Sequence, residues 1–288
     1  MIKPAATILL IDIATMSKNT LTTWRLIVTP PLPGPENMAI DEALLRSFNP
    51  QISRPVLRLY GWNPPALSLG RFQKAAEVLD LEQCRAEGVA VVRRVTGGGV
   101  IYHGEELTYS LVCAPHQIPS AASIKESFRV LTGFLLAFYQ RLGLAAAYAQ
   151  DLPLPGKLLG ARTHFCFAGR ESFDILINGR KIGGNAQRRL KEVIFQHGSI
   201  PLHNLALTGV GYMLDKGTCQ AEGVTCLAEC GAGDDFEGLQ ELLAGSFREY
   251  FRTGLVTDNF TEQEQALTGQ LLAERYSTDS WNLEGVGE

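Results

Sequence analysis

The sequence predicts an α+β fold in which a mixed sheet is flanked by helices. Three observations support it: strand-like and helix-like segments alternate up to about Leu205, helices dominate afterwards, and the chain contains no internal repeat. A chain of 288 residues fits one large domain, because single hydrophobic cores stop growing at about 250 to 300 residues. We expect an N-terminal extension over residues 1–22, a main domain over 23–252 and a short helical tail over 253–288.

The first part of the chain alternates between strands and helices. Residues 23–28 alternate in polarity like a strand, and Pro33 to Glu36 then precede a helix. Residues 89–92 are all apolar, as in a buried strand, and Gly88 ends the helix before them. In chain order, the predicted elements are a strand at 23–28, a helix with Met38, Ala39, Ala43 and Leu44 on its apolar face, strands at 56–60 and 66–69, a helix at 74–87 and a strand at 89–92.

The second part contains the clearest helix of the chain. Ser123 and Glu126 match a capping box, and the apolar residues from Ile124 to Leu142 fall on one helix face. Asn178-Gly179 is the strongest short signal for a β-hairpin. The remaining predicted elements are strands at 107–112, 173–177 and 193–200 and a strand after Arg180, a helix at 236–251, and a helix from Thr261 that has a second capping box.

Composition and charge exclude several classes of protein. Apolar residues make up 45% and charged residues 19% of the chain, which is typical of a soluble globular protein. The net charge of -4 argues against a general nucleic-acid binder, because binding phosphates needs a concentrated positive face. Two local basic clusters, Arg93-Arg94 and the segment from Arg180 to Lys191, are suited to an anionic ligand or an acidic partner.

The cysteines and the N-terminus indicate a cytoplasmic protein. Six cysteines at irregular spacing are too few for a disulfide scaffold, which favours a reducing compartment. Cys219, Cys226 and Cys230 lack a CxxC pair and a suitably spaced histidine, so we expect no metal site. The apolar run at 6–11 is too short to span a membrane and no cleavage pattern follows it, and the true start is either Met1 or Met16.

The glycine triplet Gly97 to Gly99 is a candidate ligand-binding loop. Glycines let backbone N–H groups approach an anion or a carbonyl oxygen, although a tight turn would need nothing more. The triplet does not match a phosphate P-loop, and Arg94 before it and His103 after it favour a binding role. His103 alone is more simply interpreted as a core histidine with satisfied hydrogen bonds.

Lys181 and Cys166 are the candidate reactive residues. Lys181 lies between Gly179 and Gly183-Gly184, where a ligand could approach closely, although an exposed charge after a hairpin is the plainer interpretation. Cys166 is flanked by two phenylalanines and by default is a buried, inert thiol. A cation nearby would lower its pKa and make it a nucleophile, and Lys181 is the candidate cation.

Several segments together resemble the biotin and lipoate protein ligase superfamily, and within it the LipM-type octanoyltransferases. The resemblance covers nearly the whole chain after Thr23. The matching segments are 59–70 (LYGWNPPALSLG), 93–103 (RRVTGGGVIYH), 106–110 (ELTYS), 179–187 (GRKIGGNAQ), 196–200 (QHGSI) and 280–282 (SWN).

The resemblance implies that residues 23–252 form a catalytic domain of this superfamily, which encloses an eight-carbon acyl chain. It implies that Cys166 carries the acyl group as a thioester and that Lys181 assists. The substrate-binding residues that it implies are Arg94, Thr96, Gly97, Gly98, Gly99, Tyr102, His103, Gly183, Gly184, Asn185, Ala186, His197 and Gly198.

The same resemblance implies the reaction and its partners. Octanoyl-acyl carrier protein would be the donor, and lysines of the lipoyl domains of 2-oxoacid dehydrogenases and of the glycine cleavage H protein would be the acceptors. No cofactor is expected, because the donor is already an activated thioester, and we expect a monomer that binds neither membrane nor nucleic acid.

Two alternatives remain open from the sequence. The three glycines at 97–99 and the segment Gly184-Asn185-Ala186 also match ATP-dependent lipoate-protein ligases, which would need ATP and magnesium. A non-catalytic protein that binds an acyl group or a lipoyl domain is the other alternative. Cys166 discriminates between transferase and ligase, because ligases generally lack it, whereas Lys181 is common to both.

Overall fold

The computed structural model describes residues 22–119, 123–152, 171–216 and 223–286. Its strands form three sheets, and the largest has the order β10-β11-β6-β2-β1-β13. In this six-stranded sheet β1 pairs in parallel with β2 and β13, whereas the β2–β6, β6–β11 and β10–β11 pairs are antiparallel. The predicted mixed sheet is therefore confirmed. Its strands are β1 (Thr23–Val28), β2 (Val56–Tyr60), β6 (Glu106–Cys113), β10 (Gly184–Leu190), β11 (Val193–Pro201) and β13 (Gly254–Thr257).

Two smaller sheets flank the large one. The first has the order β12-β9-β8-β7 and the second the order β4-β3-β5. Their strands are β3 (Ala66–Leu69), β4 (Ala90–Arg93), β5 (Ile101–His103), β7 (Ala146–Tyr148), β8 (Ile175–Ile177), β9 (Arg180–Ile182) and β12 (Val224–Thr225).

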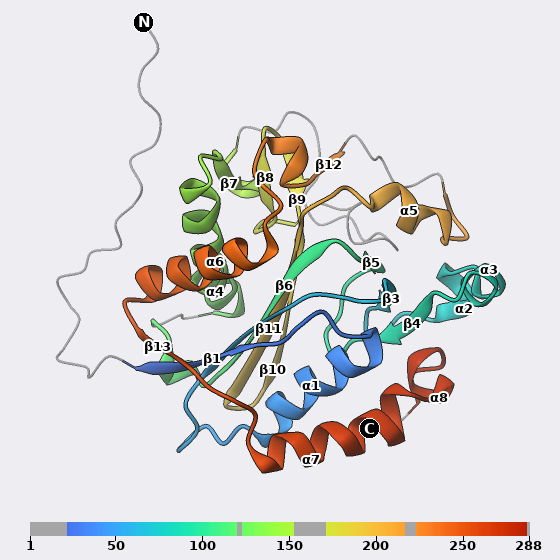
Figure 1. Ribbon diagram of the computed structural model, residues 1–288, viewed down its shortest axis with the longest axis horizontal. Coiled ribbons are helices and arrows are strands. Elements are labelled where there is room, and N and C mark those ends of the chain that lie inside the picture. Colours follow the sequence, from blue (N-terminus) through green and yellow to red (C-terminus); the bar gives the residue numbers. More distant parts are fainter. Residues whose placement is uncertain (1–21, 120–122, 153–170, 217–222, 287–288) are drawn as a thin grey trace, which may run out of the picture.

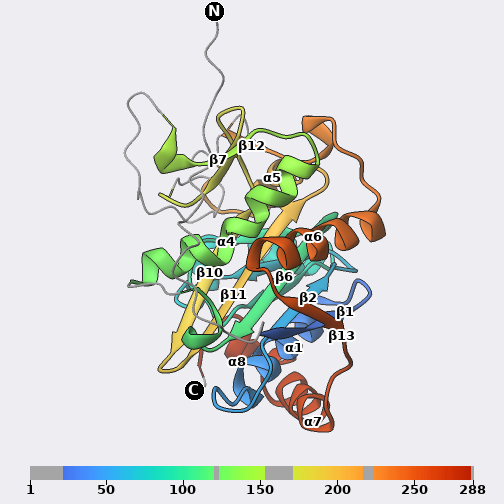
Figure 2. The same ribbon diagram turned by 90° about the vertical axis from the view of Figure 1, so that its left-hand side faces the viewer.

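Helices cover both faces of the six-stranded sheet (Figures 1 and 2). One apolar cluster joins Leu57 and Leu111 of the sheet to Phe134 of α4 and Phe247 of α6. The alternate residues of the same strands, such as Val56, face α1 on the other side. Alternation of side chains along each strand therefore supplies both halves of the core. The helices are α1 (Gly34–Ser47), α2 (Ala75–Val78), α3 (Leu81–Ala86), α4 (Ile124–Arg141), α5 (Ala206–Gly211), α6 (Phe236–Phe251), α7 (Glu262–Leu271) and α8 (Asp279–Asn282).

The local start and turn signals of the sequence are present in the structure. The Ser123 side chain caps α4 by accepting a hydrogen bond from the Glu126 amide, and Thr261 and Glu264 form a complete capping box at α7. Asn178 and Gly179 both have positive φ, of 51° and 76°, as a two-residue type I′ hairpin between β8 and β9 requires.

Three expectations about elements need correction. The helix predicted at 74–87 is two short helices, because Asp80 caps a new start by accepting a hydrogen bond from the Gln83 amide. Ile124, placed on the buried face of α4, is 63% exposed because it lies in the first turn. The segment predicted as a helical tail contains β13, which pairs with β1.

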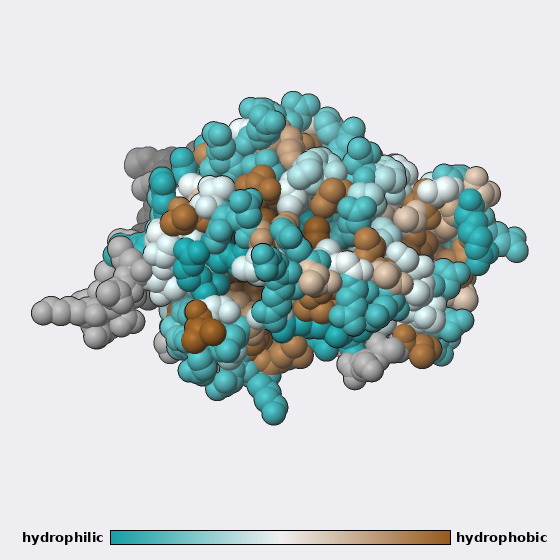
Figure 3. Space-filling model, turned by 60° about the horizontal axis from the view of Figure 1, so that its bottom comes forward, coloured by the Kyte–Doolittle hydropathy of each residue, from teal (hydrophilic) through white to brown (hydrophobic). Residues whose placement is uncertain are grey.

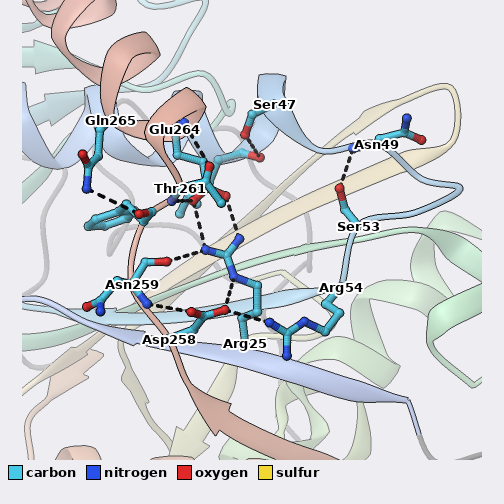
Figure 4. Close-up of polar contacts among 12 residues, drawn as sticks. Arg25, Ser47, Asn49, Ser53, Arg54, Asp258, Asn259, Thr261, Glu264 and Gln265 are labelled. Atoms are coloured by element: carbon cyan, nitrogen blue, oxygen red, sulfur yellow. Dashed lines mark hydrogen bonds and ion pairs between the residues drawn. The ribbon is translucent and has the colours of Figure 1, made fainter.

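Arg25 of β1 forms hydrogen bonds and ion pairs with the segment that connects β13 to α7 and with α7 itself (Figure 4). The Arg25 guanidinium donates to the Glu264 carboxylate at 2.7 and 3.0 Å and to Asp258 at 3.0 Å. It also donates to the Asn259 carbonyl at 2.7 Å. The residues after Arg252 are thus joined to the first strand by a buried ion pair as well as by strand pairing.

The molecular surface on the side of α1 and α7 is mostly hydrophilic. Apolar side chains on this face lie in several small groups between hydrophilic ones rather than in one large patch (Figure 3). No helix in the described part of the chain is both long and apolar enough to cross a membrane.

Candidate functional site

A pocket lies where the glycine segment after β4 meets the start of β10. The space between its lining atoms is about 400 Å³, a figure that includes solvent outside the protein. Two neighbouring strands supply one wall, because Gly184 pairs with Ser199 and Ala186 with His197 across β10 and β11. The lining residues are Trp62, Arg94, Gly97, Gly98, Ile101, His103, Thr108, Gly184, Asn185, Ala186, His197, Gly198 and Ser199.

Most of the predicted binding residues meet in this pocket, although their segments are far apart in the sequence. Thr96 lies directly behind the wall, where its hydroxyl bonds to His197 at 2.7 Å. Tyr102 faces away, and its ring stacks on Tyr212 with centroids 5.8 Å apart. Gly99 and Gly183 do not line the pocket themselves, but each is the chain neighbour of a lining residue, Gly98 and Gly184. The predicted residues that line the pocket are Arg94, Gly97, Gly98, His103, Gly184, Asn185, Ala186, His197 and Gly198.

Arg94 sets the shape of the glycine segment. Its guanidinium is buried and donates to the carbonyls of Gly97 at 3.1 Å and Gly99 at 2.9 Å. It also donates to the carbonyl and the hydroxyl of Ser68, both at 2.7 Å. Gly98 has a φ of 105°, a conformation closed to residues with a side chain. The arginine therefore acts on the loop through its carbonyl oxygens, and glycine is required at the centre.

His103 forms part of the wall, and both of its ring nitrogens are bonded. Nδ1 lies 2.8 Å from a Glu106 oxygen and Nε2 lies 2.6 Å from the Ser68 hydroxyl. The ring stacks on Trp62 with centroids 3.8 Å apart and planes 9° from parallel. The interpretation as a buried, satisfied histidine is confirmed, and the same ring also faces the pocket. With both nitrogens bonded, the ring is held in place in the pocket wall.

Glu106 is the buried acceptor at the centre of this network. Burial raises its pKa, but His103 and the hydroxyls of Thr108 and Ser199 outweigh burial and lower the pKa below its ordinary value. Trp62 in turn donates to the Thr108 hydroxyl at 2.8 Å. Sequence reasoning did not single out Glu106, Trp62 or Ser199 as site residues, although all three lie inside the matching segments.

His197 is a neutral donor or acceptor in the pocket wall. Burial holds its pKa well below the ordinary value of 6.5, and the charges of Arg94 and His103 lower the pKa further. On β10, Asn185 accepts a hydrogen bond from the Tyr109 hydroxyl at 2.7 Å. Burial keeps this tyrosine protonated by raising its pKa. The pocket thus offers polar groups that carry no charge at neutral pH.

Lys181 lies outside the pocket lining, on β9. Its side chain is only 3% exposed, so the interpretation as a solvated charge is wrong. The ammonium lies 2.8 Å from an Asp174 carboxylate oxygen, which also accepts from the Glu171 amide at 2.8 Å. Cys166 lies outside the described residues, so an effect of Lys181 on its thiol stays a prediction.

The described residues contain no group of three or more histidine, cysteine, aspartate or glutamate side chains placed to hold a metal ion. Of the three cysteines considered for zinc, Cys226 and Cys230 are described as free thiols and Cys219 is outside the described ranges.

One family model covers most of the sheet and the pocket. The sequence model of the family named lipoyl protein ligase A/B catalytic domain matches residues 33–248. The chain belongs to this family, and the resemblance noted in the sequence is confirmed.

Relatives of known name match over almost the full length. The octanoyltransferase LipM of Symbiobacterium thermophilum is 35% identical over 272 residues, which cover 91% of this chain and 98% of the relative. The octanoyltransferase LipM of Kyrpidia tusciae is also 35% identical, over 270 residues, 90% of this chain and 98% of the relative.

Solved structures show the same fold. A lipoate-protein ligase A bound with ATP superposes with a TM-score of 0.76 at 25% identity, covering 92% of this chain and 100% of that chain. The bipartite lipoate protein ligase of Thermoplasma acidophilum superposes with a TM-score of 0.76 at 25% identity, covering 93% and 98%. This chain is therefore more similar in sequence to these octanoyltransferases than to these ligases.

Proposed function

We propose that this protein is an octanoyltransferase that moves an octanoyl group from octanoyl-acyl carrier protein to the lysine of a lipoyl domain through a thioester on Cys166. The observation that carries the proposal is the 35% identity with octanoyltransferases over 91% of the chain. A cysteine placed fifteen residues before Lys181 in the sequence agrees with it.

The pocket suits a medium-length acyl group. Trp62 and Ile101 form an apolar part of the pocket wall, and polar groups lie along the glycine segment and β11. An acyl chain can bury its methylenes against the apolar part while its carbonyl meets the polar part.

The proposed reaction has two balanced steps. In the first, the Cys166 thiolate attacks the carbonyl carbon of the donor thioester, the bond to the donor sulfur breaks, and the released thiolate takes up a proton. In the second, the acceptor lysine amine attacks the new thioester, loses a proton and forms an amide, which frees Cys166. Backbone N–H groups of a glycine segment are suited to stabilising the oxyanion of each tetrahedral intermediate.

The energetics require no ATP. Exchange of one thioester for another is close to neutral in free energy, and amide formation drives the second step. ATP-dependent lipoate ligation is the second candidate, because the solved structures at 25% identity are ligases and the chain shares their three-glycine segment.

The test is covalent loading followed by transfer. Incubation with octanoyl-acyl carrier protein alone should add the mass of one octanoyl group to the protein, and Cys166→Ala should abolish the adduct. Cys230→Ala is the matched control, because Cys230 is a partly exposed free thiol that should leave loading unchanged. Adding a lipoyl domain should then move the group to its lysine.

Other outcomes contradict the proposal. An adduct that persists in Cys166→Ala would exclude the assigned nucleophile. Amide formation from free lipoate that requires ATP and magnesium would favour the ligase. Acyl binding without any transfer would favour a non-catalytic protein. The lipoyl domains of 2-oxoacid dehydrogenases and the glycine cleavage H protein are the acceptors to compare.

A further inference from the structure

The last helical turn of the described chain lies beside the strand that leads into the glycine segment. In Figure 1, α8 lies next to β4, although nearly 200 positions separate them in the sequence. Trp281 and Asn282 of α8 are 2% and 6% exposed. A chain end that is buried this deeply beside a binding segment can influence the binding site.

Arg93, the last residue of β4, makes four hydrogen bonds to this turn. Its guanidinium donates to the carbonyls of Trp281 at 2.8 Å and Leu283 at 2.9 Å. Its amide donates to the Asn282 side-chain oxygen at 3.2 Å, and the Trp281 indole donates to its carbonyl at 3.2 Å. We call Arg93, Trp281, Asn282 and Leu283 the C-terminal clamp.

The same guanidinium holds a second loop. Its NH1 group donates to the carbonyls of Gly70 at 3.2 Å, Arg71 at 3.0 Å and Gln73 at 2.6 Å. Because a guanidinium is planar and rigid, fixing it from one side also fixes what it binds on the other side. A shift of the C-terminal turn would therefore also shift the loop at 70–73, because one guanidinium is bonded to both.

The loop at 70–73 touches the glycine segment directly. A Cβ placed on Gly70 would lie 1.9 Å from the Gly98 carbonyl oxygen, so the two backbones are in tight contact. The Arg71 amide donates to the Thr96 carbonyl at 2.8 Å. Gly98 lines the pocket, and hence the contacts run without interruption from α8 to the pocket wall.

We propose that the C-terminal clamp positions the glycine loop for the acyl group, which makes residues 281–283 positioning residues of the active site. This proposal rests on the proposed function for the identity of the ligand. The glycine segment is supported from inside by Arg94 and from outside by the clamp, and only the second support depends on the C-terminus.

The test compares two variants that loosen the same C-terminal segment at different places. Asn282→Ala removes one of the four clamp hydrogen bonds and the bond from Asn282 to the Tyr276 carbonyl. Glu264→Gln instead weakens the Arg25 ion pair at α7 (Figure 4), and Glu264 belongs neither to the pocket nor to the clamp. We expect Asn282→Ala to raise KM for the octanoyl donor on the order of tenfold, with a smaller change in kcat. Glu264→Gln should lower Tm and leave KM unchanged.

Two further variants separate positioning from folding. Asn282→Asp keeps an acceptor for the Arg93 amide but loses the bond to the Tyr276 carbonyl, so KM should stay near the parent value even if Tm falls. Trp281→Phe keeps an aromatic ring and loses only the indole donor to Arg93, and it serves if Asn282→Ala does not fold.

Hydrogen exchange gives a readout that does not depend on the reaction. Amides at 95–100 should exchange faster in Asn282→Ala than in Glu264→Gln when the two are compared at equal distance below Tm. Equal exchange in both variants would overturn the clamp, whatever the activity. Failure of Cys166 loading in the parent protein would overturn the proposed function and leave the exchange result to decide the clamp.

Discussion

His197 links the chemistry of the pocket to the stability of the protein. Its folded pKa lies well below 6.5, whereas in the unfolded chain it titrates near its ordinary value. Below about pH 6.5 the unfolded state therefore binds more protons than the folded state. As the pH is lowered from there to the folded pKa, this group reduces the free energy of unfolding by up to about 1.4 kcal/mol per pH unit.

The corresponding variant is His197→Gln. It should reduce the loss of unfolding free energy between about pH 7 and about pH 5.5, because glutamine has no proton to bind. Denaturant unfolding of both proteins across this range measures the difference. A parallel pH dependence in the two proteins would contradict a neutral, buried His197.

At the scale of elements, two glycines with the same backbone conformation differ in their surroundings. Gly179 and Gly183 both have a φ of 76°. A Cβ at Gly183 would lie 2.0 Å from the Ser199 backbone oxygen, whereas nothing lies within 4 Å of one at Gly179. Alanine substitutions at these two glycines therefore distinguish the cost of backbone strain from the cost of a steric clash.

We expect Gly179→Ala to cost about 1 kcal/mol, from left-handed strain alone. Gly183→Ala should cost about 3 kcal/mol or more and weaken acyl binding, because β10 and β11 must separate where they line the pocket. Thermal or denaturant unfolding of both variants measures this. Equal losses would show that the clash is relieved elsewhere.

Local signals in the sequence predict elements well where the structure depends on a few neighbouring residues. Asn178-Gly179 and the Thr261 capping box are confirmed because each is complete within four residues. The network of Ser68, His103 and Glu106 could not be predicted in the same way. Ser68 meets His103 only because β3 pairs with β5, and that pairing is a property of the fold.

At the scale of the whole molecule, the residues after Arg252 are integrated into the fold. β13 is a strand of the main sheet, and α7 and the residues after it contribute Leu271, Tyr276 and Trp281 to a core cluster with α1. Sequence patterns could mark these helices but not their partners, because the contacts join the two ends of the chain.

A chain that ends at Arg252 should therefore fail to fold cooperatively. Removal of residues 253–288 would expose the edge of β1 and leave the Arg25 guanidinium without the partners shown in Figure 4. Circular dichroism during heating measures this. A cooperative transition at the parent Tm would instead show that residues 253–288 are a separable tail.

The hydrogen-bonded pairs described above have one more consequence, for the electrical character of the site. Arg94 and Glu106 carry opposite charges within one network, Lys181 is matched by Asp174, and His197 is uncharged at neutral pH. Arg94 and Lys181 thus each have an acidic partner in the same network. Under the proposed function, such surroundings would favour an uncharged thioester over a free fatty acid, because a carboxylate loses more hydration free energy on burial than a thioester carbonyl does.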